Sequence, residues 1–497
     1  MKEIRIETKL QNKGHYVPGM ISGHTLYISG QLPVHHETGL PMAKTIEEQT
    51  KDALHNVELV LKAAGCAKEN VVLCRVYIPD VSHWDTVNEV YGAFFGAHKP
   101  ARVIVPTRPL HNGALIEIEA VAELPGWKTG GTSMKFVCTK CGHTEAVATR
   151  KASCDCGGLW RLDYEPEAFD LGKIDTHEWS QFRYRRFMAL DGESWRDVTL
   201  GEGMTPVVRF DEDVSFKMDY FMPTLSFKDR GAAVLIAHCK AIGVDKVVQD
   251  SSGNAGNAVA AYCAKAGIDC EIFVPEGTSP KKIDMIRAHG AVCTVVPGSR
   301  DHCADVCREK VEKEGVYYAN HVYNPFFYEG TKTYIYEVFE QLGRIPANLV
   351  IPVGNGTLFL GAVFALEHLQ KSGVIDTFPQ IIALQSQNCD PLLRAAEENS
   401  DLPAPVTPTP TIAEGIAIGK PMRGTEILAL AKKHGVRFVH APEDKILEAR
   451  AAIARKGIYC EHTTAANYAA YLEYCRLYGK TPDTLITMCG AGLKSDH

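Results

Sequence analysis

Between residues 245 and 298, short runs of apolar, mostly β-branched residues alternate with longer helical patterns. The runs DKVVQ, CEIFVPEG and CTVVPG are typical of strands, whereas NAVAAYCAKAG and KKIDMIRAHG carry the apolar spacing of helices. Strands that are joined through helices lie parallel in one sheet, and such a sheet is covered by helices on both faces. The alternation therefore predicts repeated βα units and an α/β fold for the longest segment of the chain, residues 162–497.

Two shorter segments precede this region. In residues 1–125, TIEEQTKDALHNVELVLKAAG predicts a helix of about five turns, opened by a capping box of Thr45 and Glu48 and closed at Gly65. A second amphipathic helix, WDTVNEVYGAFFGAH, and several β-rich runs complete a domain of two helices on one mixed sheet, an α+β fold. Residues 126–161 are expected to form a linker, with a flexible joint in ELPGWKTGGTS, and a short cysteine knuckle.

The charge and composition of the 497-residue chain exclude several classes of function. Its formal net charge of −7, without a long basic block, argues against a nucleic-acid partner. No uncharged apolar run approaches the roughly 18 residues of a membrane span, and MKEIRIETKL lacks the apolar core of a signal peptide. We therefore expect the 16 cysteines in a reducing cytoplasm, as core thiols or metal ligands rather than disulfides.

The stretch MPTLSFKDRG raises the question of whether Lys228 is a solvated charge or a buried amine that does chemistry. Two glycine-containing loops, SSGNAGNA (251–258) and PVGNGTLFLG (352–361), each follow a predicted strand and precede a predicted helix. Free N–H groups at such a helix start suit an anion such as phosphate, although a turn with a helix cap explains either loop alone. The loop Gly354–Thr357 is the better phosphate site, because two glycines bracket it and Thr357 adds a hydroxyl.

The chain resembles threonine synthase and the other fold type II pyridoxal-phosphate enzymes in five motifs, which occur in that family's order. These are LGEGMTP (200–206), PTLSFKDRG (223–231), SSGN (251–254), GNGT (354–357) and CGAGLK (489–494). The resemblance covers roughly residues 135–497. It implies a catalytic unit with two parallel-type sheet subdomains and pyridoxal 5'-phosphate as cofactor.

The resemblance also implies a role for each matching residue. Lys228 is expected to bind the cofactor as a Schiff base and, once substrate displaces it, to move the α-proton as general base. Burial and nearby positive charge would lower its pKa, as a nucleophilic amine requires. The residues implied to bind the cofactor are Lys228, Asn254, Gly354, Asn355, Gly356, Thr357 and Cys489, and those implied to bind the substrate carboxylate are Ser251, Ser252 and Gly253.

Three positions bear on the choice of reaction. Cys489 stands where this family places a hydroxyl or thiol beside the pyridine nitrogen, which favours elimination or replacement over transamination; alternatively it is a core cysteine. Within NPFFYEGTKT, Phe327 stands where the family keeps an arginine that threonine synthases use on the substrate's phosphate. A phenyl ring cannot form charge-assisted hydrogen bonds with a phosphate. Ala255 stands where phosphate-binding members of the family often carry a hydroxyl residue. Both departures argue against O-phosphohomoserine as substrate.

The knuckle carries two cysteine pairs, Cys138-x-x-Cys141 and Cys154-x-Cys156, each followed by glycine. Four converging thiolates suit a structural zinc ion and leave no open position for catalysis. Many threonine-synthase relatives carry such a ribbon before the catalytic domain, although the second pair departs from the usual x-x spacing. The alternative is a relic knuckle that has lost its metal. His143 could replace one ligand, but we expect it to be solvated.

The front segment resembles the reactive-intermediate deaminase (YjgF-like) family across nearly all of residues 1–125. The motifs are HYVPG (15–19), ISGQLP (28–33), TVNEVYGAFF (86–95), KPARVIV (99–105) and IEIEAVA (116–122). The family hydrolyses enamines and imines to ketoacids and ammonia, and it implies a chorismate mutase-like fold and a trimer with sites between subunits.

Carried over by motif, Arg102 would bind a substrate carboxylate and Glu117 would position or activate water, with Tyr16, Ser29 and Asn88 lining the pocket. The plainer alternatives make Arg102 a surface charge, Glu117 an outward strand residue and the domain an oligomerisation module.

Elimination on pyridoxal phosphate releases an enamine, which tautomerises to an imine and must be hydrolysed. The two resemblances together predict an amino-acid lyase of the dehydratase or ammonia-lyase type, fused to a deaminase for its product. The alternatives are threonine synthase, another replacement enzyme, or a non-catalytic cofactor-binding scaffold. The partner is a small amino acid, with serine, threonine, diaminopropionate and cysteine all open. Trimeric front domains combined with dimeric catalytic domains would close a D3 hexamer, which is a hypothesis.

Overall fold

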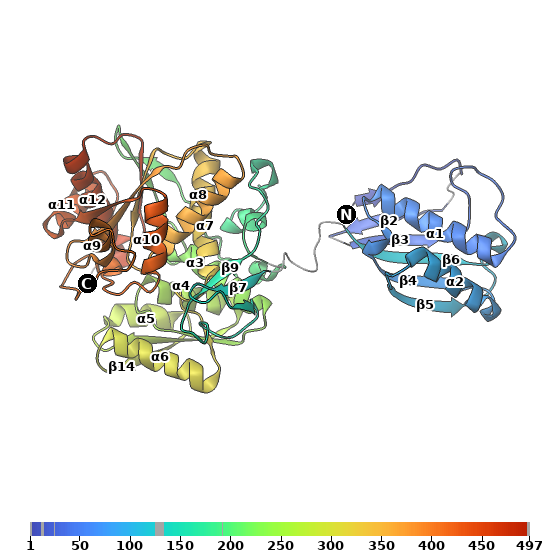
Figure 1. Ribbon diagram of the computed structural model, residues 1–497, viewed down its shortest axis with the longest axis horizontal. Helices are drawn as coiled ribbons and strands as arrows, with labels where there is room; N and C mark the ends of the chain where they lie inside the picture. The colour runs from blue at the N-terminus through green and yellow to red at the C-terminus, as the bar shows by residue number, and fades with distance from the viewer. Residues whose placement is uncertain (1, 11–13, 24, 125–133, 191, 495–497) are drawn as a thin grey trace. The chain divides into compact units, whose positions relative to one another are not determined.

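The computed structural model describes residues 2–10, 14–23, 25–124, 134–190 and 192–494. The chain forms two compact units, Met1–Gly131 and Thr132–His497 (Figure 1). The flexible joint predicted in ELPGWKTGGTS falls largely on residues 125–133, which lie outside the described residues. No helix among the described residues is both long enough and apolar enough to cross a membrane.

The first unit is a six-stranded mixed sheet with helices α1 and α2 packed side by side against it. The strands, in the order β1-β2-β3-β6-β4-β5, are Lys2–Ile4, Gly19–Ser22, Thr25–Gln31, Glu117–Glu123, Val71–Ile78 and Ala101–Pro106. Helix α1 (Ile46–Ala63) begins as predicted, since the backbone N–H of Glu48 donates to Thr45 Oγ1 at 3.2 Å. Helix α2 is Trp84–Phe95. Only the β4–β5 pair is parallel, so the predicted two helices on one mixed sheet are confirmed.

The cysteine knuckle is a three-stranded antiparallel sheet at the start of the second unit. Its strands are β8 (Thr144–Ala146), β7 (Lys135–Cys138) and β9 (Trp160–Asp163), in that order. The knuckle packs against the larger body, because the ring of Phe136 meets that of Phe326 edge-on at 6.0 Å between centroids. Arg423 Nη2 also donates to the carbonyl oxygen of Trp160 at 2.8 Å.

The rest of the second unit contains two sheets built from βα units. The larger sheet has the order β10-β11-β19-β16-β17-β18, and the smaller one β14-β13-β12-β15. All pairs are parallel except β10–β11. The larger sheet comprises Val207–Arg209, Val214–Lys217, Thr484–Thr487, Asn348–Pro352, Gln380–Ser386 and Arg437–Ala441; the smaller comprises Val292–Val296, Asp269–Pro275, Lys246–Gln249 and Tyr317–Tyr318. The predicted alternation of strands and helices is therefore confirmed.

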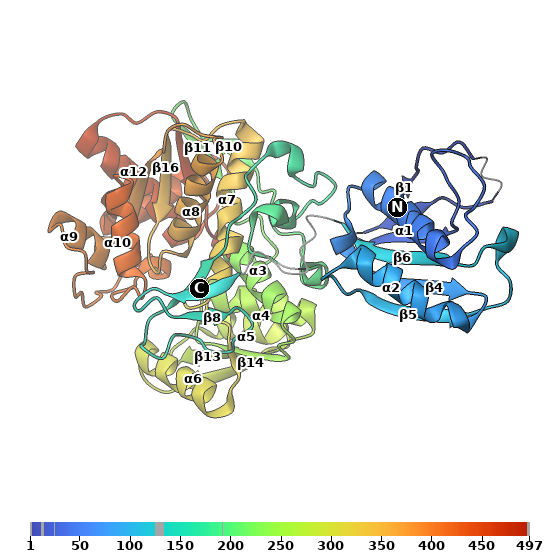
Figure 2. The same cartoon turned by 45° about the vertical axis from the view of Figure 1, so that its right-hand side comes forward.

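Ten helices of the described residues cover these sheets, with α7 and α8 side by side in both views (Figures 1 and 2). They are α3 (Lys228–Ala241), α4 (Asn254–Ala266), α5 (Pro280–Ala288), α6 (Arg300–Glu314), α7 (Phe326–Leu342), α8 (Thr357–Lys371), α9 (Pro391–Glu397), α10 (Gly424–Lys433), α11 (Ile446–Ala454) and α12 (His462–Tyr478). Three hydrophobic clusters pack between these helices and the sheets, as the burial of both sheet faces requires.

A buried ion network, defined here as Lys217, Asp219, Arg230 and Glu337, joins β11, α3 and α7. All four side chains are fully buried. Arg230 Nε donates to Asp219 at 2.8 Å and its Nη1 to Glu337 at 2.9 Å, while Lys217 Nζ donates to Glu337. The backbone N–H of Thr205, in the LGEGMTP motif, donates to the same carboxylate at 2.7 Å. This network anchors α3 two residues after Lys228.

Candidate functional site

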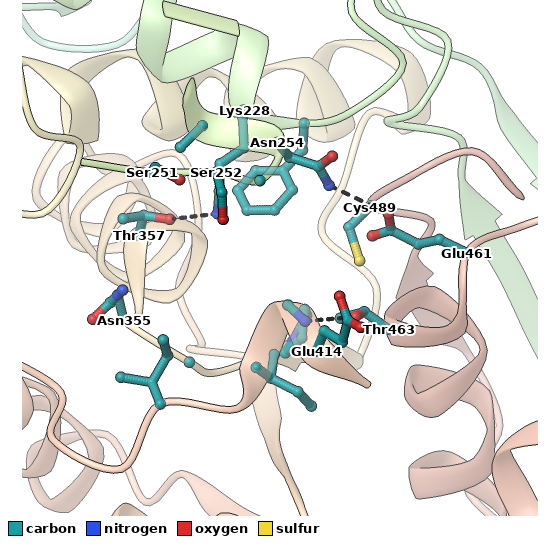
Figure 3. A pocket seen from close by; sticks show the side chains of 18 of the residues that line it. Lys228, Ser251, Ser252, Asn254, Asn355, Thr357, Glu414, Glu461, Thr463 and Cys489 are labelled. Carbon is teal, nitrogen blue, oxygen red and sulfur yellow. Dashed lines mark hydrogen bonds between the residues drawn. The ribbon is translucent and has the colours of Figure 1, made fainter. Parts of the chain in front are cut away.

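A cavity of about 410 Å³ lies in the second unit, at the starts of helices α3, α4 and α8 (Figure 3). Lys228 is the first residue of α3 and follows Leu225, whose φ of +60° marks a tight turn before the helix. Lys228, SSGN and GNGT, far apart in the sequence, all line the cavity, as does Cys489. All ten residues predicted for this cofactor and its substrate therefore face one space.

Lys228 lies in the wall of the cavity and points toward α8. Its Nζ donates to Thr357 Oγ1 at 3.3 Å (Figure 3). Burial lowers the pKa of Lys228 to about 8, and the nearby Lys494 lowers it further, against opposing effects of Cys489 and Glu461. A solvated surface lysine would keep its ordinary pKa near 10.4. The geometry therefore contradicts the solvated alternative, and the lowered pKa leaves about a tenth of the amine unprotonated at pH 7, far more than for an ordinary lysine.

The GNGT loop lines the cavity at the start of α8. Gly356 caps the helix with φ +77°, and a Cβ there would lie 2.4 Å from Ile427 Cδ1. Glycine is required at this position for both reasons. Asn355 and Thr357 border the cavity beside the free N–H groups of the first helical turn. Such a turn suits a phosphate group.

The SSGN loop lines the cavity at the start of α4. Gly253 caps this helix, and a Cβ at Gly256 would lie 1.8 Å from the carbonyl oxygen of Ser251, so the turn is closely packed. Asn254 Nδ2 donates to Glu461 Oε2 at 3.3 Å across the cavity (Figure 3). Serine hydroxyls and helix N–H groups together suit a carboxylate.

Cys489 follows β19 and is only 2% exposed. Thr464 Oγ1 and Asn467 Nδ2 each approach its Sγ to 3.4 Å. Burial raises the pKa of this thiol to about 12, and Glu461 adds to the effect. Cys489 is thus both a core residue and a neutral thiol in the wall of the cavity.

Sequence reasoning missed several residues that also line the cavity. Glu461 precedes α12, and burial raises the pKa of its carboxyl. Lys494 ends the CGAGLK motif, and its Nζ donates to the carbonyl oxygen of Thr224 at 2.7 Å. His321 and Arg300 come from the half of the unit that contains the smaller sheet. Only Lys494 lay within a motif; no local pattern marked the other three.

Phe327 lies outside the cavity lining and is fully buried. Its ring meets His321 at 5.8 Å between centroids, and a Cβ at Gly231 would lie 2.3 Å from it. Phe327 is therefore a packing residue between α3 and α7, which accords with the expectation that it binds no phosphate.

The predicted residues of the first unit occupy two faces of its sheet. Arg102 Nη2 donates to Asn88 Oδ1 at 2.9 Å, and its guanidinium lies 4.6 Å from the ring centre of Tyr91, on the face covered by α2. Arg102 pairs with Cys74 across the sheet, whereas Glu117 pairs with Tyr77. Because side chains alternate along a strand, Arg102 and Glu117 point to opposite faces.

The remaining predicted residues of this unit lie near its surface. A Cβ at Gly30 would lie 2.0 Å from Glu117 Oε1, and burial followed by the charge of Glu119 raises the pKa of Glu117. Ser29 Oγ donates to the carbonyl oxygen of Val17 at 2.8 Å, and Tyr16 is 57% exposed. One chain alone therefore does not bring Arg102 and Glu117 to a common pocket.

The four cysteines of the knuckle converge. Their Sγ atoms all lie within 4.8 Å of one another, which suits a single four-coordinate ion. His143 lies outside this cluster, exposed, with its Nε2 3.4 Å from Glu145. The predicted ligand set of Cys138, Cys141, Cys154 and Cys156 is thus brought together, without His143.

The sequence model of a protein family, described as pyridoxal-phosphate dependent enzyme, matches residues 198–490, which are more than half of the chain. The chain belongs to this family. A second model, Endoribonuclease L-PSP, matches residues 6–124, so the front unit is an L-PSP (YjgF-like) domain. The resemblances of both segments are confirmed. The cavity fits the family's cofactor, with an amine of lowered pKa at Lys228 and a glycine-dependent helix start at α8 that suits a phosphate.

Individual relatives agree with this division. The threonine synthase of Methanocaldococcus jannaschii is 30% identical over 347 residues, which cover 67% of this chain and 85% of that protein. The structure of tomato threonine deaminase isoform 2 is 21% identical with a TM-score of 0.52, over 66% of this chain and 86% of that one. A candidate endoribonuclease from Thermotoga maritima is 34% identical over 25% of this chain and 97% of that one, with a TM-score of 0.24. The second unit therefore has the fold type II architecture.

Proposed function

We propose that the second unit is an amino-acid lyase of the dehydratase or ammonia-lyase type, and that the first unit hydrolyses the enamine or imine that it releases. The observation that carries the proposal is that the Lys228 amine, the start of α4 and the start of α8 line one cavity, with Lys228 Nζ hydrogen-bonded to Thr357 of α8. Pyridoxal phosphate, when bound, supplies the electron sink for charge at the substrate's α-carbon.

The residues that line the cavity would have separate roles in the proposed reaction. The start of α8 would hold the cofactor phosphate, and Ser251 and Ser252 with the start of α4 would hold the substrate carboxylate. The Lys228 amine would take the α-proton, because its lowered pKa leaves it available as a base. Cys489 stays a neutral thiol, which does not enforce protonation of a neighbouring ring nitrogen and so favours elimination over transamination.

The first unit would act as an oligomer. Arg102 and Glu117 lie on opposite faces of the sheet, so a pocket that contains both requires a second copy of the domain. This supports the proposed trimer with sites between subunits. There Arg102 would bind the carboxylate and Glu117 the attacking water. We also propose zinc as the ion of the four-cysteine cluster, since its ligand set is closed and thiolate-only.

The second candidate is a replacement reaction like that of threonine synthase, which the 30% identity to the Methanocaldococcus protein favours. The two candidates differ in their products, since elimination yields a ketoacid and ammonia whereas replacement retains the amino group. The scaffold alternative is weakened by the intact Lys228 in a formed cavity.

The test is a screen of amino acids, including O-phospho-L-homoserine, for release of ketoacid and ammonia. We expect release by the wild type and a loss of at least about 100-fold in Lys228→Ala, the scale of one acid–base residue. Arg102→Ala should consume amino acid at the normal rate while enamine absorbance builds up. Arg108→Ala, an exposed arginine of the same unit, is the matched control. Conversion of O-phospho-L-homoserine to threonine without ketoacid would establish the replacement reaction instead.

A further inference from the structure

Two residues of the cavity lining each carry a buried polar atom without a hydrogen-bond partner among the described residues. These atoms are Asn257 Oδ1, on the first turn of α4, and His321 Nδ1, shortly after β15. Each residue is only 7% exposed, and both line the cavity. Buried polar groups are nearly always paired in native proteins. Both residues therefore bring polar side chains to the wall of the cavity contributed by the smaller sheet and its helices.

The same wall carries a free cation. Arg300, the first residue of α6, lines the cavity, is exposed, and forms no ion pair with any described residue. Lys282, a second cation of the lining, is instead neutralised by Glu414 at 2.9 Å. A guanidinium at a helix start offers several parallel N–H donors to an anion, and a carboxylate or phosphate accepts them two at a time.

The positive charges of Lys228 and Arg300 both act on the ring of His321. Burial, followed by the charges of these two residues, lowers the pKa of His321 well below its usual value. The ring is therefore neutral and has one N–H to donate. Phe327 supports the ring edge-on at 5.8 Å, so the imidazole is fixed by packing from α7. The aromatic residue that stands in place of an arginine on α7 thus orients a second polar group toward the cavity.

We propose that Arg300 and His321 form the subsite for the substrate's side chain, and that this subsite accepts a side chain with an anionic group, either a phosphate ester or a carboxylate. The inference rests on the proposed role of Lys228 in amino-acid turnover. Lys228, the start of α4, His321 and Arg300 all line one cavity, so a substrate bound at Lys228 would have its side chain within the same space as His321 and Arg300. A neutral side chain such as that of serine leaves the guanidinium without a partner.

The experiment compares three probes on the holoenzyme: O-phospho-L-serine, 3-hydroxy-L-aspartate and L-serine. Binding is measured as the change in visible absorbance of the bound cofactor, and turnover as ketoacid release. We expect the wild type to bind one acidic probe more tightly than L-serine by about 10- to 100-fold, the scale of a charge-assisted contact. Arg300→Gln should remove this preference and leave L-serine unchanged, and Arg300→Lys should restore part of it. O-phospho-L-serine carries a phosphate ester and 3-hydroxy-L-aspartate a carboxylate, so the comparison of these two probes shows which anionic group the subsite binds.

Arg308→Gln is the matched control, because Arg308 lies two turns further along α6, outside the cavity, and pairs with Asp305. Equal binding of acidic and neutral probes by the wild type, or an unchanged preference in Arg300→Gln, would overturn the subsite. Ketoacid release from L-serine in those same samples would show that the proposed lyase still holds. Absence of any spectral change or turnover with all amino acids screened would instead reject the proposed function, and the subsite with it.

Discussion

Glu337→Gln is expected to destabilise the second unit by about 3–5 kcal/mol, the cost of breaking a buried ion pair by removing one partner. Glu337 belongs to the buried ion network, in which two cations, Lys217 and Arg230, face two anions, Asp219 and Glu337. The substitution keeps the shape of the side chain but leaves the network with one uncompensated positive charge. Because Arg230 lies on the first turn of α3, cofactor retention by Lys228 should weaken as well.

The dependence of stability on acidic pH gives an independent check on the contribution of the Glu337 carboxylate. Burial by itself would raise the pKa of Glu337, but Arg230 and Lys217 together lower it far below its ordinary value of 4.5. A carboxyl with a lowered folded-state pKa contributes stability that is present above pH 4.5 and is lost as the pH falls below it. The wild type should therefore lose stability below this pH, whereas Glu337→Gln should lose less.

Urea unfolding of the holoenzyme, followed by the absorbance of the bound cofactor, measures the effect in the second unit. The matched control is Glu309→Gln on α6, which loses an ion pair of 3.1 Å to Lys313 between side chains that are 62% and 74% exposed. Its expected cost is below about 1 kcal/mol. Lys217→Met in the Glu337→Gln background should recover part of the stability, since it restores neutrality. A cost below about 1 kcal/mol for Glu337→Gln would refute the reasoning.

Three further predictions concern the sites. Cofactor uptake by the apoprotein should accelerate as pH rises through about 8, where the Lys228 amine deprotonates, and a midpoint above about 10 would contradict the lowered pKa. Gly30→Ala should slow imine hydrolysis without altering cofactor absorbance, because its Cβ would lie 2.0 Å from Glu117 Oε1 and displace the carboxylate; an unchanged rate would argue against a role of Glu117. Cys138→Ser should lower the bound zinc measured by metal analysis and reduce the melting temperature, and an unchanged metal content would exclude this ligand.

The sequence predicted the architecture and ten of the residues that line the cavity because both depend on local patterns. Alternating strand and helix periods specify βα units, and a strand, a glycine turn and a helix start specify an anion site wherever they occur. SSGN and GNGT are such units, so their place in the cavity follows from a few adjacent residues. Lys228 was recognised through the same kind of short motif, although its burial was not evident from the motif alone.

Tertiary structure alone decided which distant side chains meet. Arg300 and His321 lie on separate elements and carry no motif, so only the packing of α6 and of the segment after β15 placed them on one wall. Strand register likewise decided that Arg102 and Glu117 face opposite sides of a sheet, because the pairing of β4 with both of its neighbours sets the direction of each side chain. The motifs thus pointed to the family of the cofactor, whereas long-range packing determined which further side chains line the same cavity.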